Sequence, residues 1–230
     1  MHLLFDLDGT LTDPAPGIVA CLEYALGEMG VPSEDPDLRR FIGPPLQETF
    51  AELLSTTDRV EIDQAIGHYR TRFSDVGLFE NSVYAGIPDA LSELAEMGHD
   101  LRVATAKPHV FADRIIDHFG LRDFFPRVYG SELSGERTDK KDLIEYVLKS
   151  EVLPTNATLM IGDRRHDIAG AKANGVAAIG VSWGFGGIAE LTEAAPAAVV
   201  QSVGDLVATI GELASDRDSA RGAPTAESPS

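Results

Sequence analysis

The chain has 230 residues, of which 43% are hydrophobic and 24% charged, and its formal net charge is −18. These values are typical of an ordinary globular protein, with one large domain or a core and a smaller insert, and they exclude a fibrous or largely disordered chain. The negative charge argues against broad binding to a nucleic acid polymer or an anionic membrane, because both need a positive surface.

The first predicted element is a short apolar strand at residues 3–5, which runs directly into Asp6, Asp8 and a turn at Gly9. Side chains alternate along a strand, so Asp6 and Asp8 should point the same way. Two carboxylates so close repel each other and raise one pKa unless a positive charge lies between them. The pattern predicts a cation site or a proton-sharing pair, and the alternative is a solvated turn after an edge strand.

A block without strand-like patterns follows this turn. Asp13 and Pro14 are typical of an N-cap with proline at the first helical position. Apolar residues then recur at helical spacing, which predicts helices at about residues 14–29, 46–54 and 61–73. A helical block directly after the first strand predicts a small cap, residues 14–80, inserted into an α/β core.

From residue 81 onward, helical and strand patterns alternate. Strands are expected at about residues 101–104, 127–129, 157–161, 176–181 and 197–200. Helices are expected at about residues 87–97, 110–119, 140–149, 167–173 and 203–213. This alternation predicts a Rossmann-like, doubly wound parallel sheet, with residues 1–13 and 81–214 as the core. Residues 215–230 lack apolar periodicity, and we expect a disordered tail there.

Cys21 is the one cysteine of the sequence, so a disulfide within the chain is impossible and a reducing compartment is favoured. Because Cys21 lies in an apolar helical pattern, we expect a buried structural thiol and not a nucleophile. The N-terminus shows no basic start or cleavage site, and no apolar run is long enough to span a bilayer. We therefore expect a cytoplasmic protein with no membrane partner.

The string Asp6-Leu7-Asp8-Gly9-Thr10-Leu11 resembles the signature of the haloacid dehalogenase superfamily, in its phosphatase branch. Later segments resemble phosphoglycolate phosphatase-like members, and the likeness covers about residues 2–213. It implies a Rossmann-like core with a helical cap after the first strand. It also implies a Mg²⁺-dependent phosphatase that hydrolyses a small phosphate monoester.

This resemblance implies different roles for the first two aspartates. Asp6 would be the nucleophile that forms an aspartyl-phosphate, which water then cleaves. Asp8 would protonate the leaving alkoxide and afterwards take a proton from the attacking water. The family pattern also assigns the backbone carbonyl of Asp8 to the metal. Because the whole protein is negative, a bound cation and local positive groups must overcome its repulsion of an anionic substrate.

Phosphate-binding residues are expected where the later strands end. Thr105 and the backbone of Ala106 would hold a phosphoryl oxygen, unless Thr105 only caps the next helix. Lys107 would reach substrate or the cap, or be an ordinary surface lysine. The superfamily has a lysine that ties the nucleophile to the phosphate, and both Lys140 and Lys141 qualify. The likeness to phosphoglycolate phosphatase-like sequences selects Lys140, three residues before the first apolar residue of its helix.

The hexapeptide at residues 162–167 matches the acidic motif of the family. Asp163 would bind the metal directly. Asp167 would hold a metal-bound water or orient Lys140, and it would also suit a helix N-terminus. The predicted metal ligands are all oxygens, which favours Mg²⁺ over zinc; they are Asp6, Asp8 and Asp163.

The cap should select the substrate. Its loop at residues 41–46 resembles the specificity loop of phosphoglycolate phosphatase-like proteins, although a plain helix–helix turn is an alternative. Phosphoglycolate is the leading substrate expectation. Alternatives are a nucleotide or sugar-phosphate phosphatase, a phosphomutase, and a non-catalytic relative that binds a phospho-ligand. A phospho-signalling receiver is disfavoured because Asp6 follows the first strand. We expect a monomer or homodimer.

Overall fold

The computed structural model describes residues 1–31 and 37–222, and for residues 216–222 it describes the backbone alone. In this part of the chain, a six-stranded sheet has the order β5-β4-β1-β6-β7-β8. Its strands are β1 (His2–Phe5), β4 (Asp100–Pro108), β5 (Val128–Ser131), β6 (Thr158–Gly162), β7 (Ala177–Val181) and β8 (Ala198–Val200). All neighbouring strands pair in parallel. The predicted α/β fold with a parallel sheet is therefore confirmed.

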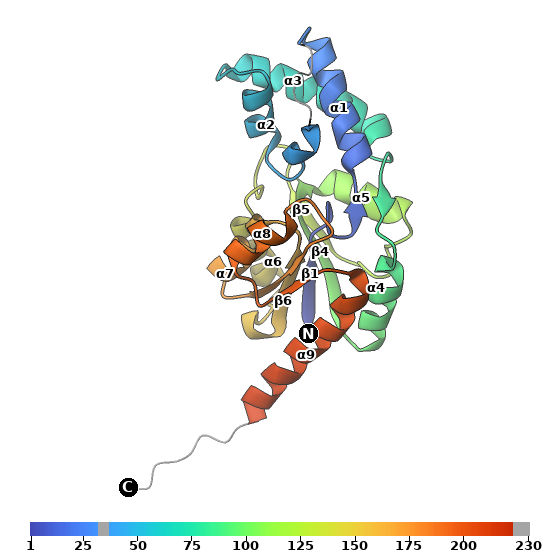
Figure 1. Ribbon diagram of the computed structural model, residues 1–230, viewed down its shortest axis with the longest axis vertical. Coiled ribbons are helices and arrows are strands. Elements are labelled where there is room, and N and C mark those ends of the chain that lie inside the picture. Colours follow the sequence, from blue (N-terminus) through green and yellow to red (C-terminus); the bar gives the residue numbers. More distant parts are fainter. Residues whose placement is uncertain (32–36, 223–230) are drawn as a thin grey trace, which may run out of the picture.

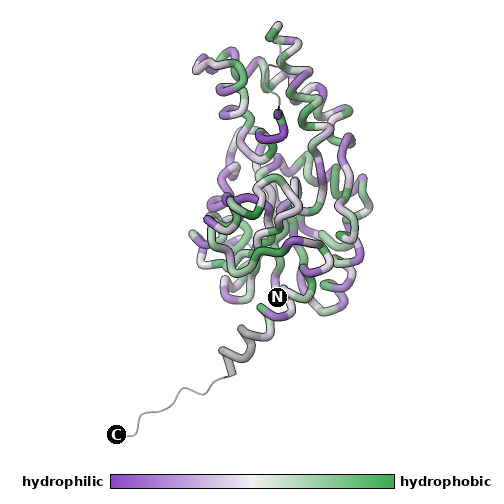
Figure 2. The backbone as a smooth tube through the Cα atoms, viewed as in Figure 1, coloured by the Kyte–Doolittle hydropathy of each residue, from purple (hydrophilic) through white to green (hydrophobic). Residues whose placement is uncertain are grey.

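Helices cover both faces of the sheet (Figure 1). One face is covered by α6 (Lys140–Glu151), α7 (Arg165–Ala173) and α8 (Gly187–Ala194), and the other by α4 (Ile87–Glu96), α5 (His109–His118) and α9 (Val203–Gly222). Side chains of β1 alternate between the two layers: Leu3 and Phe5 join one hydrophobic core and Leu4 the other. The three buried residues of β1 are all hydrophobic, as expected where both faces of a strand are covered, and Figure 2 shows hydrophobic residues in the central part of the sheet.

A group of helices lies beyond the carboxyl ends of the strands (Figure 1). It consists of α1 (Ala15–Glu28), η1 (Leu38–Phe41), α2 (Leu46–Leu53) and α3 (Arg59–Arg72), followed by a π-helical turn, η2 (Phe73–Gly77). Helix α3 packs against both α1 and α2. The Oδ1 of Asp13 accepts a hydrogen bond from the backbone N–H of Ala15 at 3.0 Å. The N-cap of α1 is Pro14 and the helix begins at Ala15, so the expected N-cap at Asp13 and first helical position at Pro14 each lie one residue too early.

Two very short strands join the segments that lead into and out of this helical group. Strand β2 (Thr12–Asp13) pairs with β3 (Ser82–Val83) in antiparallel fashion. A two-residue strand is too short to produce an alternating pattern, so the sequence gives no sign of it. We propose that the β2–β3 pair marks the two connections of the cap predicted at residues 14–80.

Two helices differ from the sequence-based expectation. Helix α9 continues to Gly222, well past Leu213, so the tail predicted from residue 215 begins too early. The buried Leu206 and Ile210 anchor its first turns, and an established helix extends at little cost. The rest of the predicted tail, residues 223–230, lies outside the described residues. Helix α8 was not predicted, because it begins at a glycine and buries a single apolar residue, Leu191.

The helices of residues 1–31 and 37–222 include none that is both long enough and apolar enough to cross a membrane.

Candidate active site

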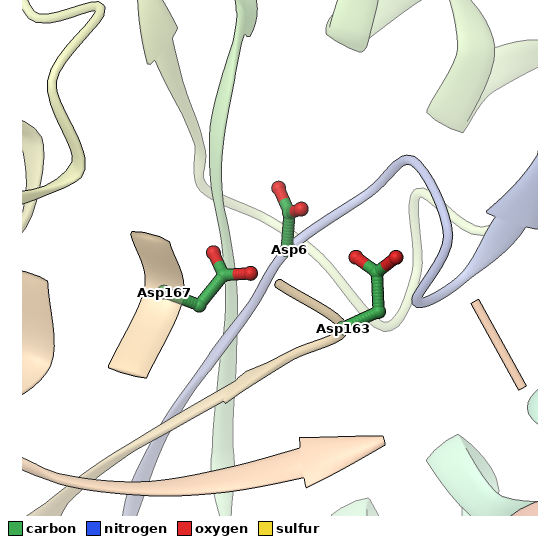
Figure 3. Close-up of side chains that lie close together, drawn as sticks. All are labelled: Asp6, Asp163 and Asp167. Carbon is green, nitrogen blue, oxygen red and sulfur yellow. The ribbon is translucent and has the colours of Figure 1, made fainter. Parts of the chain in front are cut away.

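Three buried carboxylates meet at the carboxyl end of the sheet (Figure 3). Asp6 directly follows β1, Asp163 directly follows β6, and Asp167 lies in the first turn of α7. One carboxylate oxygen from each lies within 4.8 Å of the others. β1 and β6 are neighbours in the sheet, so their ends bring these residues together although more than half the chain separates them in sequence.

Lys140, the first residue of α6, lies among these carboxylates. Its Nζ is 2.7 Å from Oδ1 of Asp6 and 2.7 Å from Oδ1 of Asp167. It also donates a hydrogen bond to the carbonyl oxygen of Ala104 in β4, at 2.8 Å. The side chain of Lys140 is buried, whereas Lys141 is exposed. Of the two lysines that the sequence offered, the structure therefore brings Lys140 to Asp6.

The acidic cluster holds more negative charge than Lys140 can neutralise. Burial, with the charges of Asp167 and Asp6, raises the pKa of Asp163 well above its usual range. Burial also raises the pKa of Asp167 to about 6, although Lys140 opposes the shift. For Lys140 burial acts to lower the pKa, but Asp167 and Asp6 outweigh it and raise the pKa. The cluster therefore favours a further cation.

The donor set fits a hard divalent cation. Oδ2 of Asp163 accepts a hydrogen bond from the backbone N–H of Phe185 at 2.7 Å, whereas its Oδ1 is buried and, among the described residues, has no hydrogen-bond partner. A buried carboxylate oxygen is costly unless a donor or a metal satisfies it. Oxygen ligands of this kind suit Mg²⁺. The cluster contains Asp6 and Asp163 from the predicted metal set, and Asp167 in place of the Asp8 side chain.

Gly9 makes the turn that follows the two aspartates. Its φ is +84°, in the left-handed region that favours glycine. A Cβ atom at this position would lie 2.2 Å from Oδ2 of Asp163, far inside van der Waals contact. The glycine of the motif therefore lets the backbone after β1 approach the carboxylate after β6.

Asp8 pairs with a second lysine. Its Oδ2 lies 2.8 Å from the Nζ of Lys107, and the two side chains are 16% and 6% exposed. Burial raises the pKa of Asp8, although the charge of Lys107 opposes the shift. The Nζ of Lys107 also lies 4.6 Å from the centre of the Phe73 ring, which belongs to η2. Among the roles left open for Lys107, the structure excludes an ordinary surface lysine.

Thr105 lies within β4 and is buried. Its hydroxyl accepts a hydrogen bond from the backbone N–H of Lys107 at 3.2 Å. The next helix, α5, begins at His109 and has no side-chain cap, so the alternative role of Thr105 as a helix cap is wrong. The carbonyl of Ala106 accepts a hydrogen bond from the hydroxyl of Ser131 at 2.8 Å. These two bonds fix the chain where phosphate binding is expected.

Sequence reasoning missed the loop after β7. Besides the Phe185 N–H that holds Asp163, the Nε1 of Trp183 donates a hydrogen bond to the carbonyl of Thr10 at 3.1 Å. The loop thus supports both the first motif and the acidic motif. Its position after a strand and its content of glycine are signals that would have indicated it, because ligand sites lie beyond the carboxyl ends of parallel strands.

Arg164, which follows Asp163, connects the α/β core to the expected specificity loop at residues 41–46. Nη1 of Arg164 donates a hydrogen bond to the carbonyl of Ile42 at 2.5 Å, and its Nε lies 3.0 Å from Oε1 of Glu190 in α8. Arg40, just before this loop, lies with its Nη1 2.7 Å from Oε1 of Glu52 in α2. The loop is thereby connected to the acidic motif.

Known proteins resemble this chain over most of its length. Residues 3–181 match the family model of haloacid dehalogenase-like hydrolases. A Pseudomonas aeruginosa protein named 5'-nucleotidase is 50% identical over 193 residues, covering 83% of this chain and 86% of that protein. Tyrosine-protein kinase PtkA of Mycobacterium tuberculosis is 38% identical over 185 residues, covering 80% of this chain and 62% of that protein. A phosphoglycolate phosphatase of Pseudomonas syringae is 27% identical over 212 residues, covering 89% of this chain and 78% of that protein.

A crystal structure of a "predicted phosphatase" from Clostridium acetobutylicum has the same fold. The TM-score is 0.87 at 42% identity, with 92% of this chain and 98% of that chain covered. The family match spans Asp6, Asp8, Thr105, Lys140 and Asp163, so the resemblance inferred from the motifs is confirmed. The chain therefore belongs to the haloacid dehalogenase-like hydrolases and is a phosphatase of that family.

Proposed function

We propose that the chain is a Mg²⁺-dependent phosphomonoester hydrolase that works through an aspartyl-phosphate at Asp6. The observation that carries this proposal is that two aspartates two residues apart are held by different lysines. Asp6 lies against Lys140 inside the acidic cluster, and Asp8 lies against Lys107. The two carboxylates thus have separate surroundings, as a nucleophile and an acid–base group require.

In the first step, a carboxylate oxygen of Asp6 attacks the phosphorus and the ester P–O bond breaks. Protonated Asp8 gives its proton to the departing oxygen, so the alcohol leaves neutral. The burial that raises the pKa of Asp8 favours the protonated form that this step needs. Lys140 balances charge on Asp6 and on the phosphoryl group, while Thr105 and the backbone of Ala106 hold phosphoryl oxygens.

In the second step, water attacks the phosphorus of the aspartyl-phosphate. Asp8, now a carboxylate, accepts a proton from this water, and the bond between phosphorus and the Asp6 oxygen breaks. Inorganic phosphate is released, and both aspartates return to their starting states. Asp167 positions Lys140 throughout, because its Oδ1 lies 2.7 Å from the Nζ.

Mg²⁺ is part of the proposal. Asp6, Asp163 and the backbone carbonyl of Asp8 would hold the ion, whose charge would let the anionic Asp6 approach an anionic phosphate. The buried Oδ1 of Asp163, which lacks a hydrogen-bond partner among the described residues, supports this assignment.

For the substrate we propose a small phosphate monoester. Phosphoglycolate is the expectation from the sequence, and a relative with that name is 27% identical. The relative named 5'-nucleotidase is 50% identical, which puts nucleoside 5'-monophosphates ahead of phosphoglycolate as candidates. We include a cytoplasmic location in the proposal because of the single cysteine. Whether the chain is a monomer or a homodimer stays a prediction.

The test is release of inorganic phosphate from nucleoside monophosphates, phosphoglycolate and sugar phosphates, with Mg²⁺ or with EDTA. We expect release to need Mg²⁺ and to fall at least about 10³-fold in Asp6→Asn. Asp142→Asn, an exposed aspartate in the first turn of α6, is the matched control and should keep wild-type rates. Equal rates for Asp6→Asn and the wild type would contradict the proposal. Phosphoryl transfer to a second substrate without free phosphate would indicate a mutase or a kinase.

A further inference from the structure

Lys107 is a buried cation to which the proposed reaction gives no role. Its side chain is 6% exposed, and its Nζ lies 2.8 Å from Oδ2 of Asp8. Among the described side chains, those of residues 1–31 and 37–215, Lys107 forms no ion pair with another carboxylate. Burying an ammonium group is costly, so its close pairing with one carboxylate needs a structural or functional explanation.

Lys107 engages one of the two carboxylate oxygens of Asp8. Oδ2 faces Lys107, whereas Oδ1 is buried and has no hydrogen-bond partner in the described part of the chain. The terminal torsion of an aspartate rotates over a broad range unless something fixes it. A lysine on Oδ2 fixes this torsion and leaves Oδ1 available for exchange of a proton.

The position of Lys107 is itself fixed from the core side. Its backbone N–H donates to the hydroxyl of Thr105 at 3.2 Å, and the preceding carbonyl, of Ala106, accepts from Ser131 at 2.8 Å. The backbone of Gly130 lies so close that a Cβ there would be 2.5 Å from the carbonyl oxygen of Lys107. These contacts fix the end of β4, which forms the expected phosphate site. They also place the side chain of Lys107 against Asp8.

An aromatic ring, that of Phe73, also contacts Lys107. The Nζ lies 4.6 Å from the centre of the Phe73 ring, an arrangement typical of a cation–π contact. Phe73 stacks on Tyr69 of α3 at 5.4 Å between ring centres and meets Phe111 of α5 edge-on at 5.3 Å. Lys107 thus lies between Asp8 of the core and an aromatic group anchored in α3.

We propose that Lys107 is a positioning residue that holds the Asp8 carboxylate with Oδ1 directed toward the leaving-group oxygen, and that Phe73 keeps Lys107 in this position. The inference rests on the acid–base role proposed for Asp8. The proposed effect of Lys107 is on the orientation of Asp8. In a variant without Lys107, the Asp8 carboxylate is still present but rotates away from the leaving-group oxygen. Phe73 belongs to η2, in the group of helices beyond the carboxyl ends of the strands. That group therefore contributes to the alignment of Asp8.

Dependence on the leaving group distinguishes this role from others. An alkyl phosphate expels an alkoxide, which needs a proton, whereas p-nitrophenyl phosphate expels a stable anion that needs none. Loss of a residue that aligns the acid should therefore slow alkyl esters much more than the nitrophenyl ester. Loss of a residue that binds phosphate or maintains the fold should slow both esters alike.

The experiment compares kcat/KM, which covers formation of the aspartyl-phosphate and not its later hydrolysis, for p-nitrophenyl phosphate and for the best alkyl phosphate of the panel. In Lys107→Met we expect kcat/KM to fall about 10²-fold on the alkyl ester and only a few-fold on the nitrophenyl ester. Lys107→Arg and Phe73→Leu should show the same selectivity with smaller losses. Lys149→Met removes an exposed lysine that pairs with Glu145, and it should match the wild type. Circular dichroism and thermal unfolding verify that each variant is folded.

Equal losses of kcat/KM on the two esters would overturn the inference. Should Lys107→Met fail to fold, Lys107→Arg and Phe73→Leu provide the same comparison. Asp8→Ala separates this inference from the proposed function. If Asp8→Ala lowers kcat/KM equally for both esters, the acid role of Asp8 is wrong. If Asp8→Ala is selective for the alkyl ester and the Lys107 variants are not, the inference about Lys107 alone is wrong.

Discussion

The Nζ of Lys140 lies 2.7 Å from Oδ1 of Asp6, so the first residue of α6 neutralises the carboxylate that follows β1. Both side chains are largely buried. A charge pair of this kind stabilises little by itself, but removing one partner leaves the other buried and unpaired. The pair therefore connects the stability of the fold to the chemistry of the site.

Lys140→Met should destabilise the metal-free protein. Both Asp6 and Asp167 lose their cation, and the free energy of unfolding should fall by about 3 kcal/mol. The control, Lys141→Met, removes the exposed neighbouring lysine and should change the free energy of unfolding by less than about 0.5 kcal/mol. Urea unfolding of both variants in EDTA measures the difference. Similar values for the two variants would show that the contacts of Lys140 do not stabilise the fold.

Mg²⁺ should stabilise the protein more at high pH than at low pH. An unfolded aspartate has a pKa of about 3.9, and burial raises the pKa of folded Asp167 to about 6. Between these values the folded state keeps a proton that the unfolded state has lost, so the metal-free protein becomes less stable as pH rises. Burial also raises the pKa of Asp163, a proposed ligand, and Mg²⁺ binds its deprotonated form, so the stabilising effect of Mg²⁺ grows with pH.

Thermal unfolding with and without Mg²⁺ measures this effect. The rise in midpoint on adding Mg²⁺ should be larger at about pH 8 than at about pH 5, where protons compete for the carboxylates. NaCl at equal ionic strength is the control for general salt effects. An identical rise at both pH values would contradict the assignment of a cation to this cluster.

Gly9→Ala should abolish activity and weaken Mg²⁺ binding. The new Cβ would meet Oδ2 of Asp163 at 2.2 Å, and φ is +84°, so either the turn or Asp163 must move. Gly27→Ala is the matched control: its Cβ meets nothing within 4 Å, and it lies inside α1. This control should keep full activity and gain about 0.5–1 kcal/mol of stability. Activity assays and Mg²⁺ titration calorimetry test both variants, and an active Gly9→Ala enzyme would contradict the geometry.

The sequence predicted the parallel sheet because helical and strand patterns alternate from residue 81 onward, and short apolar runs indicated strands buried on both faces. Leu3, Leu4 and Phe5 illustrate this, since they divide between two cores and are all fully buried. It also indicated where polar residues gather, because the strand ends place Asp6 and Asp163 at the same edge. These predictions depend on local patterns and on the regular geometry of a sheet.

Other features depend on tertiary contacts that no local pattern encodes. The sequence left three roles open for Lys107, because only the fold brings it to Asp8 and beneath Phe73. The hydrogen bond from the backbone N–H of Phe185 to Asp163 could not be predicted either, because a backbone donor does not depend on the type of residue. The two residues of β2 fall below the length at which an alternating pattern exists.

The central claim is that Asp6 carries the phosphoryl group, and direct trapping tests it best. Asp8→Ala should slow the second step because no carboxylate takes a proton from the attacking water. This variant is mixed with Mg²⁺ and p-nitrophenyl phosphate, whose leaving group needs no proton, and then quenched in acid. Peptide mass spectrometry should find one phosphoryl group on Asp6 that hydroxylamine removes. The same variant carrying Asp6→Asn should show none. A phosphoryl group on another residue, or its persistence in the double variant, would contradict the account.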